Sequence, residues 1–350
     1  MMALPKTKTL PSVRRQPVSA AAADLVRFAP LDPAWSLPLV ISPAVSGVDL
    51  TTWAQKHKAL LEEHLLRHGA LLFRGFSVDS AAVLERFVEA LSGGALPYRE
   101  RSSPRSKAEG NVYTSTEHPP EYRIFLHNEQ SYNLVFPLRI YFACQTPAAA
   151  GGETPIADVR GVLRRLDPDI VQRFARRKYR YVRNFNDGLG LRWETAFQTE
   201  SRAEVESYCR ENQIGFVWGE GGRLSTWQER EVIARHPISG ELAWFNHATF
   251  FHVSTLDRPV REALLAGGDR SELPNNTYYG DGSPIEPKTL DALRRAYEAE
   301  MVSFPWQQGD LLMLDNMICA HARAPFLGPR STLVAMSTPT PWELCLPGAG

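Results

Sequence analysis

The sequence has few cysteines, no long hydrophobic run and no excess of charge of either sign. Its four cysteines are scattered without a Cys-X-X-Cys pair, at positions Cys144, Cys209, Cys319 and Cys345. This spacing argues against a disulfide framework and favours a reduced, cytoplasmic compartment. The 39 basic residues balance the 39 acidic ones, which argues against a nucleic-acid or membrane partner. No apolar stretch has the length needed to span a bilayer.

The amino-terminal segment lacks the apolar core of a secretory signal, although it contains proline, lysine and arginine. We expect residues 1–20 to form a flexible tail. A transit peptide is the alternative, because Arg14 and Arg15 precede an alanine-rich stretch that is poor in acids. The remainder shows no internal repeat and no long low-complexity linker. We therefore expect residues 21–350 to form a single domain.

Short apolar segments separated by Gly- and Pro-rich turns predict strands at residues 70–73, 138–144, 179–182, 216–218, 241–245, 311–314 and 332–336. Helix-capping and periodicity signals predict helices at 52–68, 80–91, from 167, from 201, and at 289–301. Short strands with helices between them indicate a mainly β fold with inserted helices, a sandwich or jelly roll rather than a doubly wound sheet.

The most informative motif is His127-Asn-Glu129, which follows an apolar run, together with the distant His321. Side chains two apart on a strand point to the same face, so His127 and Glu129 can converge on one atom. Two imidazoles and one carboxylate with open positions are typical of non-haem Fe(II) oxygenases. The alternative is a strand-edge histidine with a nearby surface carboxylate and an unrelated core histidine.

Three neighbouring features favour the metal site. Thr154, in a Gly-Gly-Glu-Thr turn, supplies a hydroxyl close in sequence to the first ligands. Arg330 opens an apolar strand nine residues after His321, and its guanidinium can bind the distal carboxylate of a diacid bidentately. Asp315 and Asn316 precede His321 and are expected to orient it.

Five segments occur in a characteristic order: GALLFRGF at 69–76, HNEQSY at 127–132, GGETPIAD at 151–158, NNTYYGDG at 275–282, and the block 306–336. On these segments, the chain resembles the taurine dioxygenase family of Fe(II)/2-oxoglutarate-dependent oxygenases. Within that family it is most similar to the branch of the syringomycin-cluster aspartyl hydroxylase. The resemblance spans most of the chain, from about residue 69 to residue 341.

The resemblance implies a double-stranded β-helix core of the jelly-roll or cupin-like type. It implies that His127, Glu129 and His321 bind Fe(II), which 2-oxoglutarate chelates. It further implies that Arg330 binds the distal carboxylate of 2-oxoglutarate and that Thr154 donates a hydrogen bond to the same group. Arg323 is the alternative arginine, because the interval from His321 to Arg330 is shorter than in taurine dioxygenase.

The reaction that the resemblance implies consumes O2 and converts 2-oxoglutarate to succinate while an unactivated C–H bond is hydroxylated. The implied substrate is an amino acid, or an aminoacyl group tethered to a carrier protein, in the metabolism of peptide natural products such as antibiotics. Related halogenases replace the carboxylate ligand by a small residue, so Glu129 favours hydroxylation over chlorination. Desaturation, epoxidation and cyclisation use the same ligands and remain open.

Two other classes of protein fit parts of the pattern. A zinc hydrolase with a His2Glu site would use the same three ligands, but it would leave Arg330 and Thr154 without a role. A non-catalytic, cupin-like binding protein would not require an intact diacid-binding arginine. From position alone, the candidate substrate contacts are Asn111, Tyr113, Gln130, Tyr132 and Asn246.

A basic run between residues 164 and 183 is a candidate surface for a protein partner. It contains Arg164, Arg165, Arg173, Arg176, Arg177, Lys178, Arg180 and Arg183. It is either a solvated helix flank balanced by acids elsewhere or a docking surface for an acidic peptidyl carrier protein.

Overall fold

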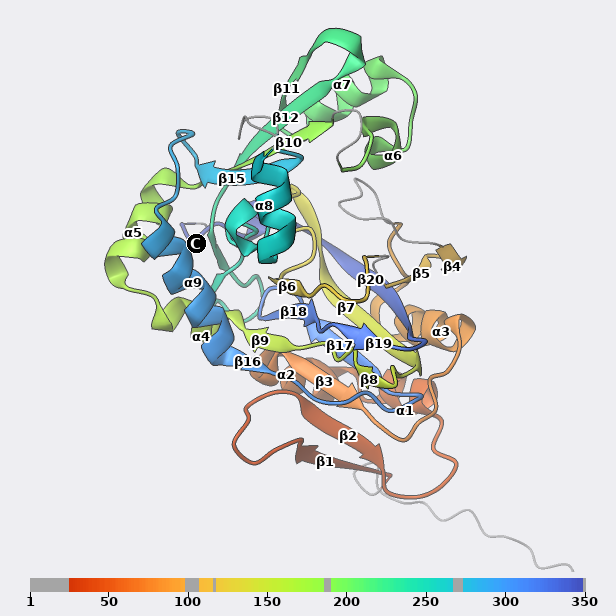
Figure 1. Cartoon of the computed structure of the whole chain (residues 1–350). Helices are drawn as coiled ribbons and strands as arrows, with labels where there is room; N and C mark the ends of the chain where they lie inside the picture. The colour runs from red at the N-terminus through yellow and green to blue at the C-terminus, as the bar shows by residue number, and fades with distance from the viewer. Residues whose placement is uncertain (1–24, 98–106, 116–117, 186–189, 267–272, 349–350) are drawn as a thin grey trace, which may run out of the picture.

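A computed structural model describes residues 25–97, 107–115, 118–185, 190–266 and 273–348. The expected tail at residues 1–20 lies outside these ranges. The described chain is mainly β, with helices around two principal sheets (Figure 1). The larger sheet has eight strands in the order β1 (Val26–Pro30), β2 (Leu39–Pro43), β3 (Ala70–Phe73), β17 (Leu311–Asp315), β7 (Val135–Thr146), β20 (Ser331–Pro341), β5 (Val112–Thr114) and β4 (Lys107–Glu109).

The smaller principal sheet has four strands in the order β16 (Met301–Val302), β9 (Ile156–Asp158), β18 (Cys319–Arg323) and β6 (Ile124–His127). The larger sheet is covered on both of its faces. In its strand β3 all four side chains are buried, although successive side chains point to opposite faces. Ala70 and Leu72 pack in a cluster that also contains Ile156 and Cys319 of the smaller sheet. The alternate residues, Leu71 and Phe73, pack against the helices on the other face.

Those helices are α1 (Leu50–Lys56), α2 (Lys58–His68) and α3 (Ala81–Ser92). The single helix predicted at 52–68 is wrong in detail, because the segment forms two helices. Asp49 caps the first helix by accepting a hydrogen bond from the Thr52 N–H. The chain leaves helical geometry at His57, whose Nδ1 lies 2.7 Å from the Trp53 carbonyl oxygen. The side chain competes there for a backbone acceptor.

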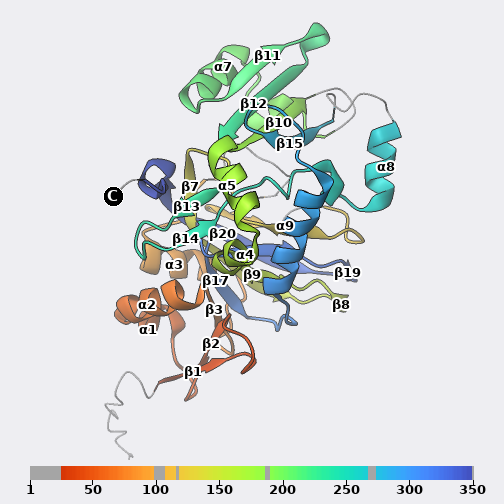
Figure 2. The ribbon, with the colours of Figure 1, turned by 90° about the vertical axis from the view of Figure 1, so that its left-hand side faces the viewer.

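The predicted helix starts at residues 80, 167 and 201 are confirmed. Ser80, Asp167 and Ser201 each cap a helix through their side-chain oxygen. The remaining helices are α4 (Val159–Arg165), α5 (Pro168–Arg177), α6 (Trp193–Phe197), α7 (Arg202–Glu211), α8 (Arg258–Ala266) and α9 (Pro287–Glu300). Figure 2 shows α4, α5 and α9 together on one side of the molecule.

A further sheet has the order β11 (Gly215–Trp218), β12 (Leu224–Arg230), β10 (Tyr179–Phe185) and β15 (Asn275–Tyr279). With α6 and α7 it forms the lobe at the top of Figure 1, which has a small core of its own. Two short pairs complete the strands, β13 (Ile233–Arg235) with β14 (Leu242–Trp244) and β8 (Ala150–Gly151) with β19 (Phe326–Leu327). Short 3-10 helices lie at η2 (Glu220–Gly222), η3 (Val253–Thr255) and η5 (Trp342–Cys345).

The seven predicted strands are all present, and most extend beyond the predicted ends. All four cysteines are buried and have free thiols. Among the described residues, no helix combines the length and the hydrophobicity needed to cross a bilayer.

Candidate metal centre and co-substrate cavity

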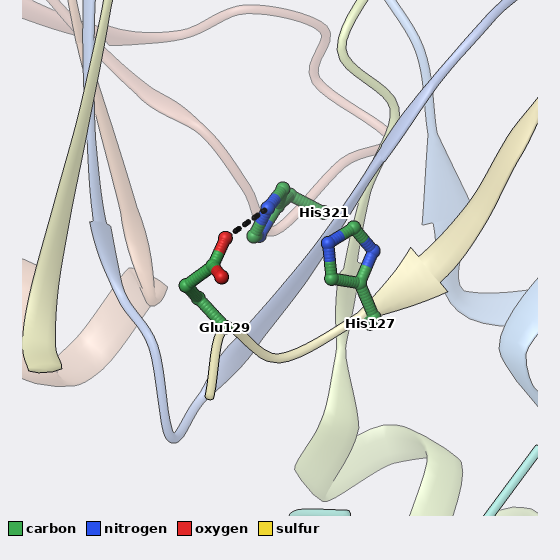
Figure 3. A group of neighbouring side chains, drawn as sticks. All are labelled: His127, Glu129 and His321. Carbon is green, nitrogen blue, oxygen red and sulfur yellow. Dashed lines mark ion pairs between the residues drawn. The ribbon is translucent and has the colours of Figure 1, made fainter. Parts of the chain in front are cut away.

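Strands β6 and β18 bring the two candidate histidines together, although they are far apart in the sequence. The strands are antiparallel, and His321 pairs directly with His127 in the register. The two ring centroids lie 4.3 Å apart. Glu129 follows the end of β6, and its Oε2 is 4.0 Å from His321 Nε2. One ligand atom from each of the three residues lies within 4.8 Å of the others (Figure 3).

The donor set fits a divalent metal ion. His127 Nδ1 lies 2.9 Å from the Phe125 carbonyl oxygen. A carbonyl only accepts, so Nδ1 carries the proton and Nε2 has the lone pair that a metal needs. The Glu129 carboxylate supplies a negative charge beside the two imidazoles. Two histidines and one carboxylate leave further coordination positions for a chelating co-substrate and O2.

Asn316 holds the segment that carries Glu129. Its Oδ1 accepts a hydrogen bond from the Glu129 N–H, and its Nδ2 donates to the carbonyls of Glu129 and Pro137, each at 2.8 Å. Asn128 Nδ2 in turn donates to the Asn316 carbonyl. All these bonds are buried. The expectation that Asn316 orients His321 is therefore corrected, because its side chain positions Glu129 instead.

The partners of the Asp315 carboxylate likewise lie elsewhere. Its buried carboxylate pairs with Arg139 and lies 3.0 Å from His236 Nε2. Burial by itself would raise the pKa of this carboxyl, but Arg139 and His236 outweigh it and lower the pKa below the ordinary value of 3.8. Asp315 thus belongs to a buried charge network at the end of β17.

Two cavities meet at the candidate metal centre. The larger has a volume of about 260 Å³ and is lined by His127 and Glu129. The smaller is lined by His127 and His321 and also by Thr154 and Arg330. A metal ion between the three ligands would therefore face both spaces, one for the co-substrate and one for the substrate.

The smaller cavity contains the groups expected to bind a keto-diacid. Thr154 is buried, and its Oγ1 accepts a hydrogen bond from Trp306 Nε1 at 3.1 Å. This leaves the Thr154 O–H to donate to a ligand. Arg330 Nε donates to the Gly152 carbonyl at 2.8 Å, and Nη1 donates to Ser115 Oγ at 3.1 Å. These bonds orient the guanidinium within the cavity.

The charge of Arg330 has no carboxylate partner among the described residues, where no ion pair to it is found. Burial, followed by repulsion from Arg323, lowers its pKa to about 10. A dicarboxylate would relieve both effects. Arg323 also lines the cavity, but its guanidinium donates to three backbone carbonyls of the 118–122 loop. Arg330 is therefore the better placed of the two arginines.

Neither cavity is lined by any of the five candidate substrate contacts, which are Asn111, Tyr113, Gln130, Tyr132 and Asn246. Asn111 and Asn246 bind backbone groups of the Ala95 and Val232 segments. The Tyr132 ring is buried among other aromatic rings. Position along the sequence could not separate side chains that satisfy buried backbone groups from side chains that face a cavity.

One wall of the larger cavity is formed by His247, Phe250 and Phe251, which were not among the candidate substrate contacts. The Phe250 ring stacks on His127 with centroids 4.3 Å apart. His247, which follows the candidate contact Asn246, lines the cavity, and its Nδ1 lies 2.5 Å from Ser131 Oγ. Burial, with a smaller effect of His127, lowers the pKa of His247 well below its usual value, so the ring is neutral at pH 7.

Most cations of the basic run 164–183 have carboxylate partners. Six of the eight form ion pairs, which are Arg164–Asp158, Arg165–Glu300, Arg173–Glu286, Arg177–Asp281, Lys178–Glu231 and Arg180–Glu229. This pairing favours a balanced helix flank over a surface that offers unpaired positive charge.

Comparison with known proteins places these features in context. The profile of the taurine catabolism dioxygenase TauD, TfdA family matches residues 27–336. The chain is 42% identical over 300 residues to the dapdiamide synthesis protein DdaC of Enterobacter agglomerans, covering 86% of this chain and 91% of DdaC. It is 30% identical over 314 residues to a clavaminate synthase-like protein of Arabidopsis thaliana, covering 87% and 91%.

Solved structures share the fold at lower identity. PvcB, an Fe, alpha-ketoglutarate dependent oxygenase from an isonitrile synthetic pathway, matches with a TM-score of 0.52 and 17% identity, over 91% of this chain and 93% of PvcB. The protein AAD-2, in complex with Mn(II) and N-oxalylglycine, matches with a TM-score of 0.52 and 15% identity, over 91% and 99%. A crystal structure of the PvcB protein from Pseudomonas aeruginosa also matches, with the same TM-score of 0.52.

Proposed function

We propose that this protein hydroxylates an amino acid or a carrier-tethered aminoacyl group. The chain belongs to the taurine catabolism dioxygenase TauD, TfdA family and is an iron- and 2-oxoglutarate-dependent dioxygenase. The observation that carries this proposal is the meeting of two cavities at one candidate metal centre. One cavity contains Arg330 and Thr154, which suit a keto-diacid, and the other combines aromatic and aliphatic side chains with polar and charged ones.

In this proposal His127, Glu129 and His321 hold Fe(II), and they are also the catalytic residues of the site. When bound, the iron centre uses O2 and 2-oxoglutarate to convert a C–H bond of the substrate to an alcohol, with succinate and CO2 as the other products. As a ligand, the Glu129 carboxylate would take a coordination position that would otherwise be open to a halide, which favours hydroxylation over chlorination. Asn316 holds the Glu129 peptide and thereby keeps the carboxylate in place.

Arg330 and Thr154 bind the distal carboxylate of 2-oxoglutarate. A buried guanidinium binds a carboxylate strongly, because both charges are removed from water together and the hydrogen bonds are charge-assisted. The Thr154 O–H adds a donor, and Trp306 fixes its oxygen. Because Arg330 and Thr154 line the same cavity as His127 and His321, they would hold the co-substrate beside the metal ligands.

The facing sheets support a double-stranded β-helix, or jelly roll, as the core of a single domain over residues 21–350. The eight-stranded and four-stranded sheets share one hydrophobic cluster. Both imidazoles project from strands of the smaller sheet, where a rigid backbone holds them more tightly than a loop would.

The size of the larger cavity supports a small substrate. Its volume of about 260 Å³ lies just below the range of roughly 300–1,000 Å³ that is typical of sites for drug-sized ligands. The relatives named for dapdiamide synthesis and for an isonitrile synthetic pathway support a role in specialised biosynthesis, such as that of an antibiotic. The carrier-tethered form of the substrate would require an acidic peptidyl carrier protein as partner, in the cytoplasm.

Desaturation, epoxidation and cyclisation remain alternative outcomes at the same ligands. A zinc hydrolase or a non-catalytic cupin-like protein would give no role to the oriented, buried Arg330 beside the metal ligands.

The proposal is tested by adding Fe(II) and 2-oxoglutarate to the purified protein without oxygen. We expect a weak visible charge-transfer band that is absent from His127→Ala. The control is His68→Ala, because His68 is a surface residue that binds the Ser36 carbonyl far from the site in sequence. Oxygen consumption that does not depend on 2-oxoglutarate, or the absence of a band, would contradict the proposal.

A further inference from the structure

The larger cavity has a metal-binding end and a charged mouth. His127 and Glu129 lie at one end, and Phe125, Phe250 and Phe251 contribute aromatic walls. Apart from Glu129, the charged residues among its described lining residues are Arg123 and Asp257. One positive and one negative group therefore face the space in which the substrate binds.

Arg123 and Asp257 come from segments that are far apart in the sequence. Arg123 directly precedes β6, and Asp257 directly precedes α8. Arg123 Nε and Asp257 Oδ1 are 3.6 Å apart, and the two side chains are 47% and 33% exposed. An exposed ion pair contributes only about 0.2–1 kcal/mol to stability. A ligand that replaces each partner can therefore separate the pair at little cost.

Neighbouring groups do not already account for these charges. The diacid is assigned to Arg330, which lines the smaller cavity rather than the larger one. The His247 ring is buried, and its Nδ1 lies 2.5 Å from Ser131 Oγ. His118 lines the same cavity, and burial, together with repulsion from Arg323, lowers the pKa of its imidazole. Arg123 and Asp257 are thus the charged side chains among the described lining residues that are not candidate metal ligands.

We propose that Arg123 and Asp257 bind the carboxylate and the ammonium of the substrate, which is a free α-amino acid rather than an aminoacyl thioester. This inference rests on the proposed function, since it places the head group at the mouth and the oxidised carbon at the metal centre. The guanidinium pairs with the α-carboxylate, and the Asp257 carboxylate pairs with the α-ammonium. A thioester has no α-carboxylate and would leave Arg123 without its ligand.

Two consequences follow for the substrate. Its side chain extends from the mouth past Phe125 and Phe250 toward His127, so it contains an apolar stem. The oxidised carbon lies on this side chain and not at Cα, because the charged groups hold the α-carbon away from the metal ligands.

The test uses the protein loaded with Fe(II) and 2-oxoglutarate without oxygen. Each of the twenty proteinogenic L-amino acids is titrated, with binding measured by calorimetry and by the change in the charge-transfer band. The tightest ligand is then compared with its methyl ester, its N-acetyl derivative and its pantetheine thioester. We expect each derivative to bind at least tenfold more weakly than the free amino acid.

Charge-removing variants assign the two ends of the ligand. Arg123→Gln is expected to weaken binding of the free amino acid at least tenfold and to leave binding of the methyl ester unchanged. Asp257→Asn is expected to weaken binding of the free amino acid and of the ester, but not binding of the N-acetyl derivative. Arg258→Gln is the matched control, because Arg258 is the neighbour of Asp257 and pairs with Glu262 on the exposed face of α8.

Equal affinity for the ester or thioester and the free amino acid would overturn the inference, as would the absence of binding by all twenty amino acids. The band that forms before any amino acid is added reports on the proposed function separately. A normal band without a preference for the zwitterion refutes the head-group site alone. A missing band refutes the proposed function itself.

Discussion

Asn316 and Glu129 hold each other through a two-way hydrogen bond, although they are 187 positions apart in the sequence. The Asn316 Oδ1 accepts from the Glu129 N–H, and the Asn316 Nδ2 donates to the Glu129 carbonyl, both at 2.8 Å. The carboxamide thus replaces a backbone partner for a residue that lies just beyond the end of a strand. Asn316 thus holds the carboxylate ligand through its main chain.

Removing this bond should weaken metal binding more than it weakens the fold. In Asn316→Asp the acceptor remains but the donor is lost, so the Glu129 peptide is held on one side only. We expect metal affinity to fall about 10- to 100-fold, as is typical when a group supporting a ligand is removed. Anaerobic titration with Fe(II) measures the affinity, and thermal unfolding without metal tests the fold. Unchanged affinity would show that Glu129 needs no such support.

Replacing Arg330 should abolish co-substrate binding without destabilising the protein. Charge-assisted hydrogen bonds to a carboxylate are worth about 1.5–3 kcal/mol each, so Arg330→Met is expected to weaken 2-oxoglutarate binding at least 100-fold. Arg330→Lys should be intermediate, because it keeps the charge but loses the bidentate fork. The apo protein should be as stable as wild type, since a desolvated cation has been removed.

Calorimetry measures this binding, and thermal unfolding with and without 2-oxoglutarate measures the linked stabilisation. If 2-oxoglutarate still raises the unfolding temperature of Arg330→Met as it does in the wild type, the diacid binds elsewhere.

Gly152 should be required for the position of Arg330. A Cβ at Gly152 would lie 2.9 Å from Ala148 Cβ and 3.0 Å from Arg330 Cδ. We expect Gly152→Ala to raise the KM for 2-oxoglutarate several-fold, because the arginine must move. The matched control is Gly240→Ala, since Gly240 has a similar positive φ but no atom within 4 Å of its Cβ position. Equal effects in the two variants would assign the change to backbone strain and not to Arg330.

The buried network around Asp315 should make a stability contribution that depends on pH. Asp315→Asn leaves the buried Arg139 with Glu62 as its remaining carboxylate partner, so we expect a loss of about 3 kcal/mol at pH 7. Urea unfolding measures this free energy. Glu262→Gln, which removes an exposed partner of Arg258, is the control and should stay close to wild type.

The pKa of Asp315 is lower in the folded state than its ordinary value of 3.8. Its carboxylate therefore stabilises the fold fully above about pH 3.8 and loses this effect as the pH falls through the lowered folded-state pKa. The difference between wild type and Asp315→Asn should accordingly shrink below pH 3.8. A constant difference down to pH 2 would mean that the charge of Asp315 contributes nothing.

Local sequence signals predicted the helices well where a single capping side chain decides the residue at which the helix begins. Ser80, Asp167 and Ser201 each bond to a nearby backbone N–H within their own segment, so the sequence pattern is sufficient to locate the helices. The break at His57 was missed because an apolar stripe continues through it. The local competition of His57 Nδ1 for a carbonyl has no periodic signature.

The candidate metal ligands could also be proposed from the sequence, since His127, Glu129 and His321 stand out by residue type and spacing. The structure brings them together, and it adds Thr154 and Arg330 in one cavity with two of them. The roles of Asp315 and Asn316 and the contacts of Asn246 were not predictable. They depend on which buried backbone groups need a hydrogen-bond partner.

The sequence by itself determined the ligand types, the capped helices and the apolar strands, because each depends on the identity of a residue and its immediate neighbours. Only the tertiary structure decided which cavity each side chain faces, that Asn316 supports Glu129, and that Arg123 meets Asp257 at the mouth. These relationships depend on strand register and on packing between distant segments. A shift of one residue in the pairing of β6 with β18 would turn His127 to the opposite face of the sheet.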